Sequence, residues 1–201
     1  MSKSYNRKDR YYEKAKEEGY RSRAAFKLVE LNQRLKLIKR NFKVLDLGCW
    51  PGSWLQVISN LIGPSGVVVG IDLTRIEPLS EANVHFIKGN AADSKIIEEA
   101  ISFIGCKFNI VLSDMSPKLT GISELDGAQC AACAFLALES ARLALEKQGH
   151  LVIKLFKSQD AEEFIKAARK YFIKVQRCAL ETTRNTSNEF YFCGSGFMPG
   201  N

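Results

Sequence analysis

The sequence predicts an α/β fold, with a mostly parallel sheet covered by helices on both faces. At 201 residues the chain is long enough for one domain with a full hydrophobic core. Short apolar stretches alternate with helical patterns, which is typical of parallel sheets. The last two predicted strands are joined by the polar stretch 182–188 without a helix, and this predicts an antiparallel hairpin at the sheet edge.

The first predicted element is an amphipathic helix that follows a basic N-terminal arm. Leu28, Leu31, Leu35 and Ile38 recur at steps of three, four and three residues, the spacing of one helix face. Ser22 is the predicted N-cap.

Strands and helices then alternate to the end of the chain. The predicted strands are 43–47, 67–72, 84–87, 108–113, 150–156, 173–180 and 189–193. The predicted helices are 54–62, 95–104, 127–147 and 161–171. We expect one domain overall, in which residues 1–40 form an RNA-binding arm and helix and residues 41–201 form the main α/β unit.

The excess positive charge lies entirely in the N-terminal part. Through residue 40 the chain has 13 lysines or arginines and five acidic residues, and the whole chain has a net charge of +7. Tyr5, Tyr11, Tyr12 and Tyr20 are interleaved with these cations. Cations displace counterions from phosphates and aromatic rings stack on bases, so this pattern is typical of nucleic-acid binding. A solvated helix face explains the charge alone equally well.

The N-terminus is too polar for a secretory signal, and no apolar run approaches the ~20 residues that span a bilayer. We expect a cytoplasmic protein with no membrane partner, or a mitochondrial or nuclear one if the source is eukaryotic. Six cysteines without the density of a disulfide scaffold fit a reducing compartment. Cys130 and Cys133 form a lone CxxC far from His85 and His150, so we interpret them as helix residues rather than zinc ligands.

Acidic residues and glycines at the ends of the first two strands predict a nucleoside-type cofactor. The first strand and the loop after it supply Asp46, Gly48 and Gly52, and Asp72 ends the second strand. A carboxylate at that position can accept hydrogen bonds from both hydroxyls of an adenosine ribose. The loop lacks the GxGxxG spacing that holds a pyrophosphate, so it suits S-adenosylmethionine better than a dinucleotide.

Four polar residues interrupt the apolar pattern at strand or helix positions. Lys154 lies inside an apolar strand, Asp114 ends another, Glu189 begins the last, and Lys27 lies beside the stripe of the first helix. An unpaired buried charge is costly, so these residues either pair or have a function. An ion-pair network that braces the strand ends is the structural alternative.

Here the sequence resembles the FtsJ/RrmJ family of ribose 2′-O-methyltransferases, whose bacterial members modify a uridine of large-subunit ribosomal RNA. The stretches that carry the resemblance are 9–28 (DRYYEKAKEEGYRSRAAFKL), 46–54 (DLGCWPGSW), 113–121 (SDMSPKLTG), 152–156 (VIKLF) and 188–191 (NEFY). The resemblance implies a Rossmann-like methyltransferase fold with an antiparallel last strand, S-adenosylmethionine as cofactor, and RNA as substrate. The family's catalytic Lys-Asp-Lys-Glu group falls on Lys27, Asp114, Lys154 and Glu189.

The resemblance also implies cofactor contacts at Gly52, Trp54, Asp72 and Asp114. Asn90 stands where the family often has an acidic residue that contacts the adenine, and an amide can still form a hydrogen bond there. Trp50 and Ser53 replace the usual small residues of the first loop.

The chemistry explains the four residue types. A ribose hydroxyl is a poor nucleophile, so a base must accept its proton during attack on the sulfonium methyl. We expect Lys154 to be this base, with Lys27 favouring its neutral form, Asp114 orienting it and Glu189 holding Lys27 or the ribose. The reaction needs no metal.

In the N-terminal arm, we expect Arg7, Lys8, Arg10, Arg21 and Arg23 to contact phosphates of the RNA. Large-subunit ribosomal RNA, or the assembled subunit, is the expected partner of a monomeric enzyme. The alternatives are a tRNA or mRNA-cap methyltransferase, a non-catalytic RNA-binding protein, and a nucleotide-dependent oxidoreductase. The last requires phosphate-binding glycines that this loop lacks.

Overall fold

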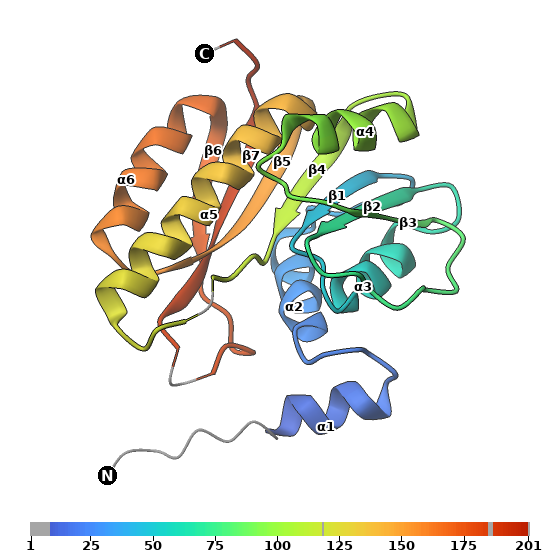
Figure 1. Ribbon diagram of the computed structural model, residues 1–201, viewed down its shortest axis with the longest axis horizontal. Helices are drawn as coiled ribbons and strands as arrows, with labels where there is room; N and C mark the ends of the chain where they lie inside the picture. The colour runs from blue at the N-terminus through green and yellow to red at the C-terminus, as the bar shows by residue number, and fades with distance from the viewer. Residues whose placement is uncertain (1–8, 118, 185–186, 201) are drawn as a thin grey trace.

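A computed structural model describes residues 9–117, 119–184 and 187–200. It confirms the predicted fold class: a seven-stranded sheet has the order β3-β2-β1-β4-β5-β7-β6, with helices on both faces (Figure 1). All paired strands are parallel except β7, which runs antiparallel to its neighbours β5 and β6. The last strand is therefore inserted between β5 and β6.

The strands are β1 Lys43–Leu47, β2 Val67–Asp72, β3 Val84–Lys88, β4 Phe108–Ser113, β5 Leu145–Phe156, β6 Phe172–Cys178 and β7 Glu189–Phe197. The helices are α1 Arg10–Glu17, α2 Ala25–Leu35, α3 Ser53–Ile62, α4 Ser94–Ile104, α5 Ser123–Ala144 and α6 Gln159–Ala168, followed by the 3₁₀ turn η1 Arg169–Tyr171. The strand order reverses between β1 and β4, so a ligand site is expected beyond the carboxyl ends of these strands.

Several predicted boundaries in the C-terminal half differ from the structure by a few residues, and two of these differences have a clear physical reason. The helix predicted at 127–147 ends at Ala144, because Leu145 pairs with Phe108 and already belongs to β5. The last strand continues past Cys193 through two glycines, which are usually depleted in strands. Gly194 is accommodated because the ring of Phe172 occupies the space of its missing Cβ.

The N-terminal part differs more from the prediction. It contains α1, which the hydrophobic pattern did not predict. Asp9 caps this helix by accepting hydrogen bonds from two backbone N–H groups. The predicted cap of α2 was wrong: the N-cap residue is Ala24, whereas the Ser22 hydroxyl accepts the Ala24 N–H from outside the helix. At the other end Lys36 adopts a left-handed conformation, so Ile38 is buried but lies beyond the helix.

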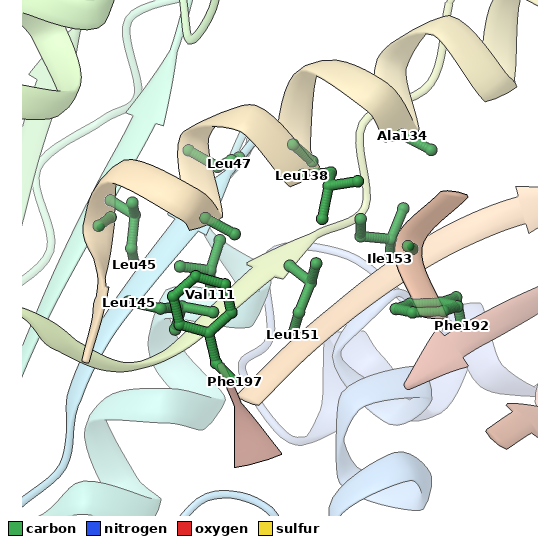
Figure 2. Close-up of a cluster of buried hydrophobic side chains, with 14 of the residues drawn as sticks. Leu45, Leu47, Val111, Ala134, Leu138, Leu145, Leu151, Ile153, Phe192 and Phe197 are labelled. Atoms are coloured by element: carbon green, nitrogen blue, oxygen red, sulfur yellow. The ribbon is translucent and has the colours of Figure 1, made fainter. Parts of the chain in front are cut away.

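Two hydrophobic clusters hold the helices on the sheet. On one face Leu45, Val111 and Leu151 point toward α5, where Leu138 covers them (Figure 2). On the other face α2 and α3 pack together, and Leu28 is almost completely buried there. Because α2 is part of this second cluster, its side chains are fixed relative to the sheet.

Helix α5, with 22 residues, carries the CxxC pair. Cys130 is buried and Cys133 half-buried, and both are free thiols. Within the part of the chain that the structure describes, no group of three or more His, Cys, Asp or Glu side chains is arranged to hold a metal ion. In the same ranges neither α5 nor another helix combines the length and apolar character that crossing a membrane requires.

Candidate active site

The four residues predicted to be catalytic meet at one edge of the sheet. Asp114 follows β4, Lys154 lies near the end of β5, and the antiparallel β7 begins at the same edge with Glu189. The β5–β7 register pairs Phe156 with Glu189. Lys27 reaches the edge from α2, where it forms an ion pair with Glu189.

Lys154 and Asp114 form the inner ion pair. The Lys154 amine lies 3.2 Å from Asp114 Oδ1 and donates a hydrogen bond of 2.7 Å to the Asp114 main-chain carbonyl. The side chains are 6% and 18% exposed. Tyr191 completes the group, since its hydroxyl donates to Asp114 Oδ1 over 2.9 Å. The amine is therefore held in one position by two oxygen atoms of the same residue.

Lys27 and Glu189 form the outer ion pair. Lys27 Nζ lies 2.5 Å from Glu189 Oε1, and the Thr183 hydroxyl donates to the same oxygen over 3.0 Å. The side chains are 14% and 9% exposed. This pair joins the second helix of the chain to its last strand.

The charges of the two pairs act on each other. Burial raises the pKa of the Asp114 carboxyl. The positive charges of Lys154 and Lys27 together outweigh this effect, so the pKa of Asp114 lies below its ordinary value. Burial and the neighbouring Asp114 raise the pKa of Tyr191 well above its ordinary value. Asp114 is therefore charged and Tyr191 neutral over the physiological pH range.

A cavity of about 680 Å³ opens in front of the pairs. Lys27, Lys154 and Glu189 line it together with Arg23 and Arg184. Asp126 is a second carboxylate of the lining, so four cations face two carboxylates, and the excess of positive charge suits an anionic ligand.

Two residues of the cavity wall and its surroundings were not among the predicted site residues. Asp9 accepts hydrogen bonds from the guanidinium groups of both Arg23 and Arg184. Arg23 also donates to the Thr182 carbonyl and lies over the ring of Tyr11. The signal for Arg184 was its place in the polar stretch before the last strand, since loops at the ligand edge of a sheet often carry binding residues.

Tyr191 was quoted in the NEFY stretch, but the sequence analysis gave it no role. Its signal was the strand period of two, which puts residues 189 and 191 on the same face of β7.

The predicted cofactor residues lie at the carboxyl ends of β1 to β4, on the same sheet edge. Asp72 accepts the Trp50 N–H over 2.9 Å and the Thr74 N–H over 2.7 Å, so its carboxylate has a fixed orientation. Asp46 is 1% exposed, and its Oδ2 has no hydrogen-bond partner within the described residues. Burial, then Asp114 and Asp72, raise the pKa of Asp46 well above its ordinary value.

Both predicted loop glycines have a positive φ, +77° at Gly48 and +104° at Gly52. A Cβ on Gly48 would lie 2.5 Å from Met115 Cγ, and one on Gly52 would lie 2.9 Å from Arg21 Nη1. The glycines therefore make room for two protein side chains, a reason that the sequence analysis did not foresee.

Trp54 and Asn90 have different surroundings. Trp54 is buried at the start of α3, where its indole N–H donates to the Ala24 carbonyl and its ring lies 6.1 Å from that of Tyr191. Asn90 is exposed beyond β3, and its side-chain oxygen accepts the Ala92 N–H. Trp54 thus connects the start of α2 to β7, whereas Asn90 shapes a turn.

Both the sequence and the structure of the chain are similar to those of known methyltransferases. The model of the FtsJ-like methyltransferase family matches residues 20–197. The ribosomal RNA large subunit methyltransferase E of Desulfatibacillum aliphaticivorans is 40% identical over 187 residues, which cover 93% of this chain and 89% of the relative. The protein of the same name from Syntrophobacter fumaroxidans is 39% identical and covers 95% and 96%, respectively.

Among solved structures, a ribosomal RNA methyltransferase from Plasmodium falciparum is similar with a TM-score of 0.77 and 26% identity, covering 90% of this chain and 100% of that one. The fibrillarin of Aeropyrum pernix, whose crystal structure contains S-adenosyl-L-methionine, shares the fold with a TM-score of 0.59 and 16% identity, covering 84% and 74%. The similarity thus extends over most of this chain.

Proposed function

The chain belongs to the FtsJ-like methyltransferase family, and from this premise we propose that it methylates a ribose 2′-hydroxyl of large-subunit ribosomal RNA. The observation that carries the proposal is the buried Lys154 amine, held by two oxygens of Asp114 on the wall of a cation-lined cavity. The names of the relatives support ribosomal RNA as the substrate.

We propose S-adenosyl-L-methionine as the cofactor, and the acidic groups of the sheet edge fit it. The buried Asp46 Oδ2, which has no partner among the residues that the structure describes, suits a ligand with hydrogen-bond donors, and the oriented Asp72 carboxylate suits a ribose diol. When bound, the cofactor supplies an electrophilic methyl group. The residues that would hold it are Asp46, Gly48, Gly52, Trp54, Asp72, Asn90 and Asp114.

In this proposal Lys154 is the general base. A neutral Nζ accepts the proton of the 2′-hydroxyl, and the oxygen becomes nucleophilic as that proton leaves. Asp114 keeps the amine at one point through its carbonyl and its carboxylate. Tyr191 restrains the carboxylate in turn, because its hydroxyl donates to the Oδ1 that faces the amine.

Lys27 has a supporting role. It lines the same cavity as Lys154, and Glu189 fixes its position. Four cations and two carboxylates, Asp126 and Glu189, line the cavity, so the arrangement favours an anionic RNA backbone.

We propose that the RNA backbone follows the cations of residues 1–40 into this cavity. Arg23 and Arg184 line it, and Arg10 lies on the neighbouring α1 over the ring of Tyr11. The expected contacts of Tyr5, Arg7 and Lys8 lie outside the described residues. Each phosphate contact adds about 1 to the salt slope of binding, so Arg23→Gln and Arg184→Gln should each reduce that slope in a filter-binding titration.

The first experiment is transfer of a labelled methyl group from S-adenosyl-L-methionine to three substrates: large ribosomal subunits lacking the modification, free ribosomal RNA, and total tRNA. Nucleoside analysis identifies the product. A labelled 2′-O-methyl nucleotide in ribosomal RNA supports the proposal, and label in the subunits alone shows that assembly is required. Label only in tRNA contradicts ribosomal RNA as the substrate but still supports methylation of a ribose 2′-hydroxyl. No label in any substrate supports a non-catalytic RNA-binding protein.

We further propose that the enzyme acts in the cytoplasm, since its named relatives are ribosomal RNA methyltransferases, and that it acts as a monomer. Sedimentation of the free protein and of its complex with large subunits tests the monomeric state. A dimer in the free state would contradict it.

A further inference from the structure

The segment between α1 and α2 is attached to the start of α3. The Arg21 N–H donates to Gln56 Oε1 over 2.9 Å, and Gln56 Nε2 donates to the Gly19 carbonyl over 3.0 Å. The hydroxyls of Ser22 and Ser53 are hydrogen-bonded at 2.8 Å. Because α3 follows the loop of Gly52 directly, this attachment joins the N-terminal part to the cofactor side of the sheet.

The Arg21 guanidinium joins two loops of that side. It donates to the Pro51 carbonyl over 3.0 Å, to the Glu77 carbonyl over 2.6 Å and to the Pro78 carbonyl over 2.8 Å. Pro51 lies between β1 and α3, whereas Glu77 and Pro78 lie between β2 and β3. Three carbonyls on two loops suit the guanidinium of arginine, which spreads its N–H donors over a planar fork, whereas lysine has its three N–H donors on a single nitrogen.

The close approach of Arg21 depends on Gly52. The missing Cβ of this glycine would lie 2.9 Å from Arg21 Nη1 and 3.4 Å from its Cδ, so the guanidinium fills the space that a side chain would take. A positive φ at the same residue favours glycine independently. The loop and the arginine are therefore fitted to each other.

The two loops that Arg21 joins also orient Asp72. One loop supplies the Trp50 N–H and the other the Thr74 N–H, and both donate to the Asp72 carboxylate. We propose that Arg21 is a positioning residue for the methyl-donor site: it holds these loops in the arrangement that accepts the cofactor. The inference rests on the proposed cofactor, but it does not depend on which RNA is methylated.

This role differs from the phosphate contact expected of Arg21 from the sequence. A phosphate contact needs positive charge, whereas joining the loops needs the forked geometry of the guanidinium. Arg21→Lys keeps the charge and removes the fork, so it separates the two roles.

The test measures binding of S-adenosylhomocysteine, the demethylated product, by isothermal titration calorimetry without RNA. We expect Arg21→Lys to weaken binding about tenfold, which corresponds to about 1.4 kcal/mol. RNA affinity and its salt slope should stay within about twofold of wild type, since the charge remains. The exposed Trp50 on the joined loop gives a second readout, because its fluorescence should change on ligand binding in the wild type and less in the variant.

The matched control is Arg34→Lys. Arg34 also donates to a main-chain carbonyl, that of Ala179, but on the loop before β7. It should bind S-adenosylhomocysteine like wild type. Equal weakening in both variants would overturn the inference in favour of general destabilisation, and wild-type binding by Arg21→Lys would overturn it directly. Lost RNA affinity with normal ligand binding would make Arg21 a phosphate contact.

If Arg21→Lys fails to fold, Gln56→Leu takes its place. This variant removes the other attachment of the segment, and we expect about threefold weaker binding, or about 0.65 kcal/mol. A folded Gln56→Leu with unchanged affinity would then overturn the inference. A wild-type protein that bound no S-adenosylhomocysteine would contradict the proposed cofactor and, with it, the role of Arg21, whatever the RNA substrate.

Discussion

The inner and outer ion pairs each join a lysine to a carboxylate, but they are held in place differently. Lys154 and Asp114 come from adjacent parallel strands, and the Lys154 amine binds the main chain as well as a carboxylate. Lys27 and Glu189 come from a helix and a strand, and side-chain contacts alone bring them together. Sheet hydrogen bonds therefore fix the proposed base, whereas the packing of α2 fixes its cationic neighbour. A base needs a defined position, while a neighbouring charge acts over a wider range of distances.

The largest effect should come from breaking the inner pair at its amine. We expect Lys154→Met to lower kcat about 10²–10⁴-fold, the range of general base catalysis, with unchanged affinity for S-adenosylhomocysteine. Single-turnover methyl transfer and calorimetry measure the two quantities. Lys157→Met, an exposed position just beyond β5, is the matched control and should be fully active. Normal turnover by Lys154→Met would remove the proposed base.

Breaking the outer pair should cost less. Lys27→Met removes a charge that acts on the base from outside, and we expect kcat to fall about a hundredfold, or about 2.7 kcal/mol. It also leaves Glu189 nearly buried without its cation, so the melting temperature should fall. The double variant Lys27→Met/Glu189→Gln should regain stability without regaining activity. If the double variant regained both stability and activity, the outer pair would have only a structural role.

Asp46 adds a third buried group to the comparison: it lies near the inner pair, and in the described part of the chain its Oδ2 has no hydrogen-bond partner. Its raised pKa means that the folded protein retains a proton which the unfolded chain releases above about pH 3.9. Stability therefore falls as the pH rises from there toward the folded-state pKa. Asp46→Asn should raise the free energy of unfolding by about 1–3 kcal/mol at neutral pH. The gain should vanish at pH 3, where the carboxyl is protonated in both states.

Urea denaturation at the two pH values measures this gain, and calorimetry should show weaker binding of S-adenosylhomocysteine by the same variant. A variant less stable than wild type at neutral pH would mean that the Asp46 carboxylate stabilises the fold.

The smallest effect should come from Tyr191→Phe. The variant removes the hydrogen bond to Asp114 Oδ1 but leaves the Lys154–Asp114 contacts in place, so we expect kcat to fall about threefold, or about 0.65 kcal/mol. Pre-steady-state kinetics with saturating cofactor measures the change. A loss as large as that of Lys154→Met would show that the tyrosine acts directly on the reacting groups.

The sequence predicted the sheet better than the N-terminal part, for a physical reason. Buried strands need continuous apolar runs, and the strands at residues 43–47, 67–72 and 108–113 begin and end where the sequence predicted. Helix α1 is polar and its helical signal is a cap, so no apolar pattern indicated it.

The candidate site divides in the same way. Residues that interrupt an apolar run, such as Lys154 and Asp114, could be identified from the sequence, and the structure brings them together. The bonds of Arg21 to distant carbonyls leave no pattern in the sequence, because any backbone carbonyl can accept them. The need for glycine at position 52 could not be predicted either, because it depends on which distant side chain approaches that residue in the fold.

The position of β7 between β5 and β6 has a consequence for how the protein is made. A ribosome releases the chain from its amino end, so β5 and β6 emerge before the strand that joins them. Until β7 is synthesised, the β5 edge is unpaired and β6 has no place in the sheet. The same strand brings Glu189 and Tyr191 to the site. A nascent chain therefore cannot complete this part of the sheet, or place Glu189 and Tyr191 at the candidate site, until β7 has been synthesised.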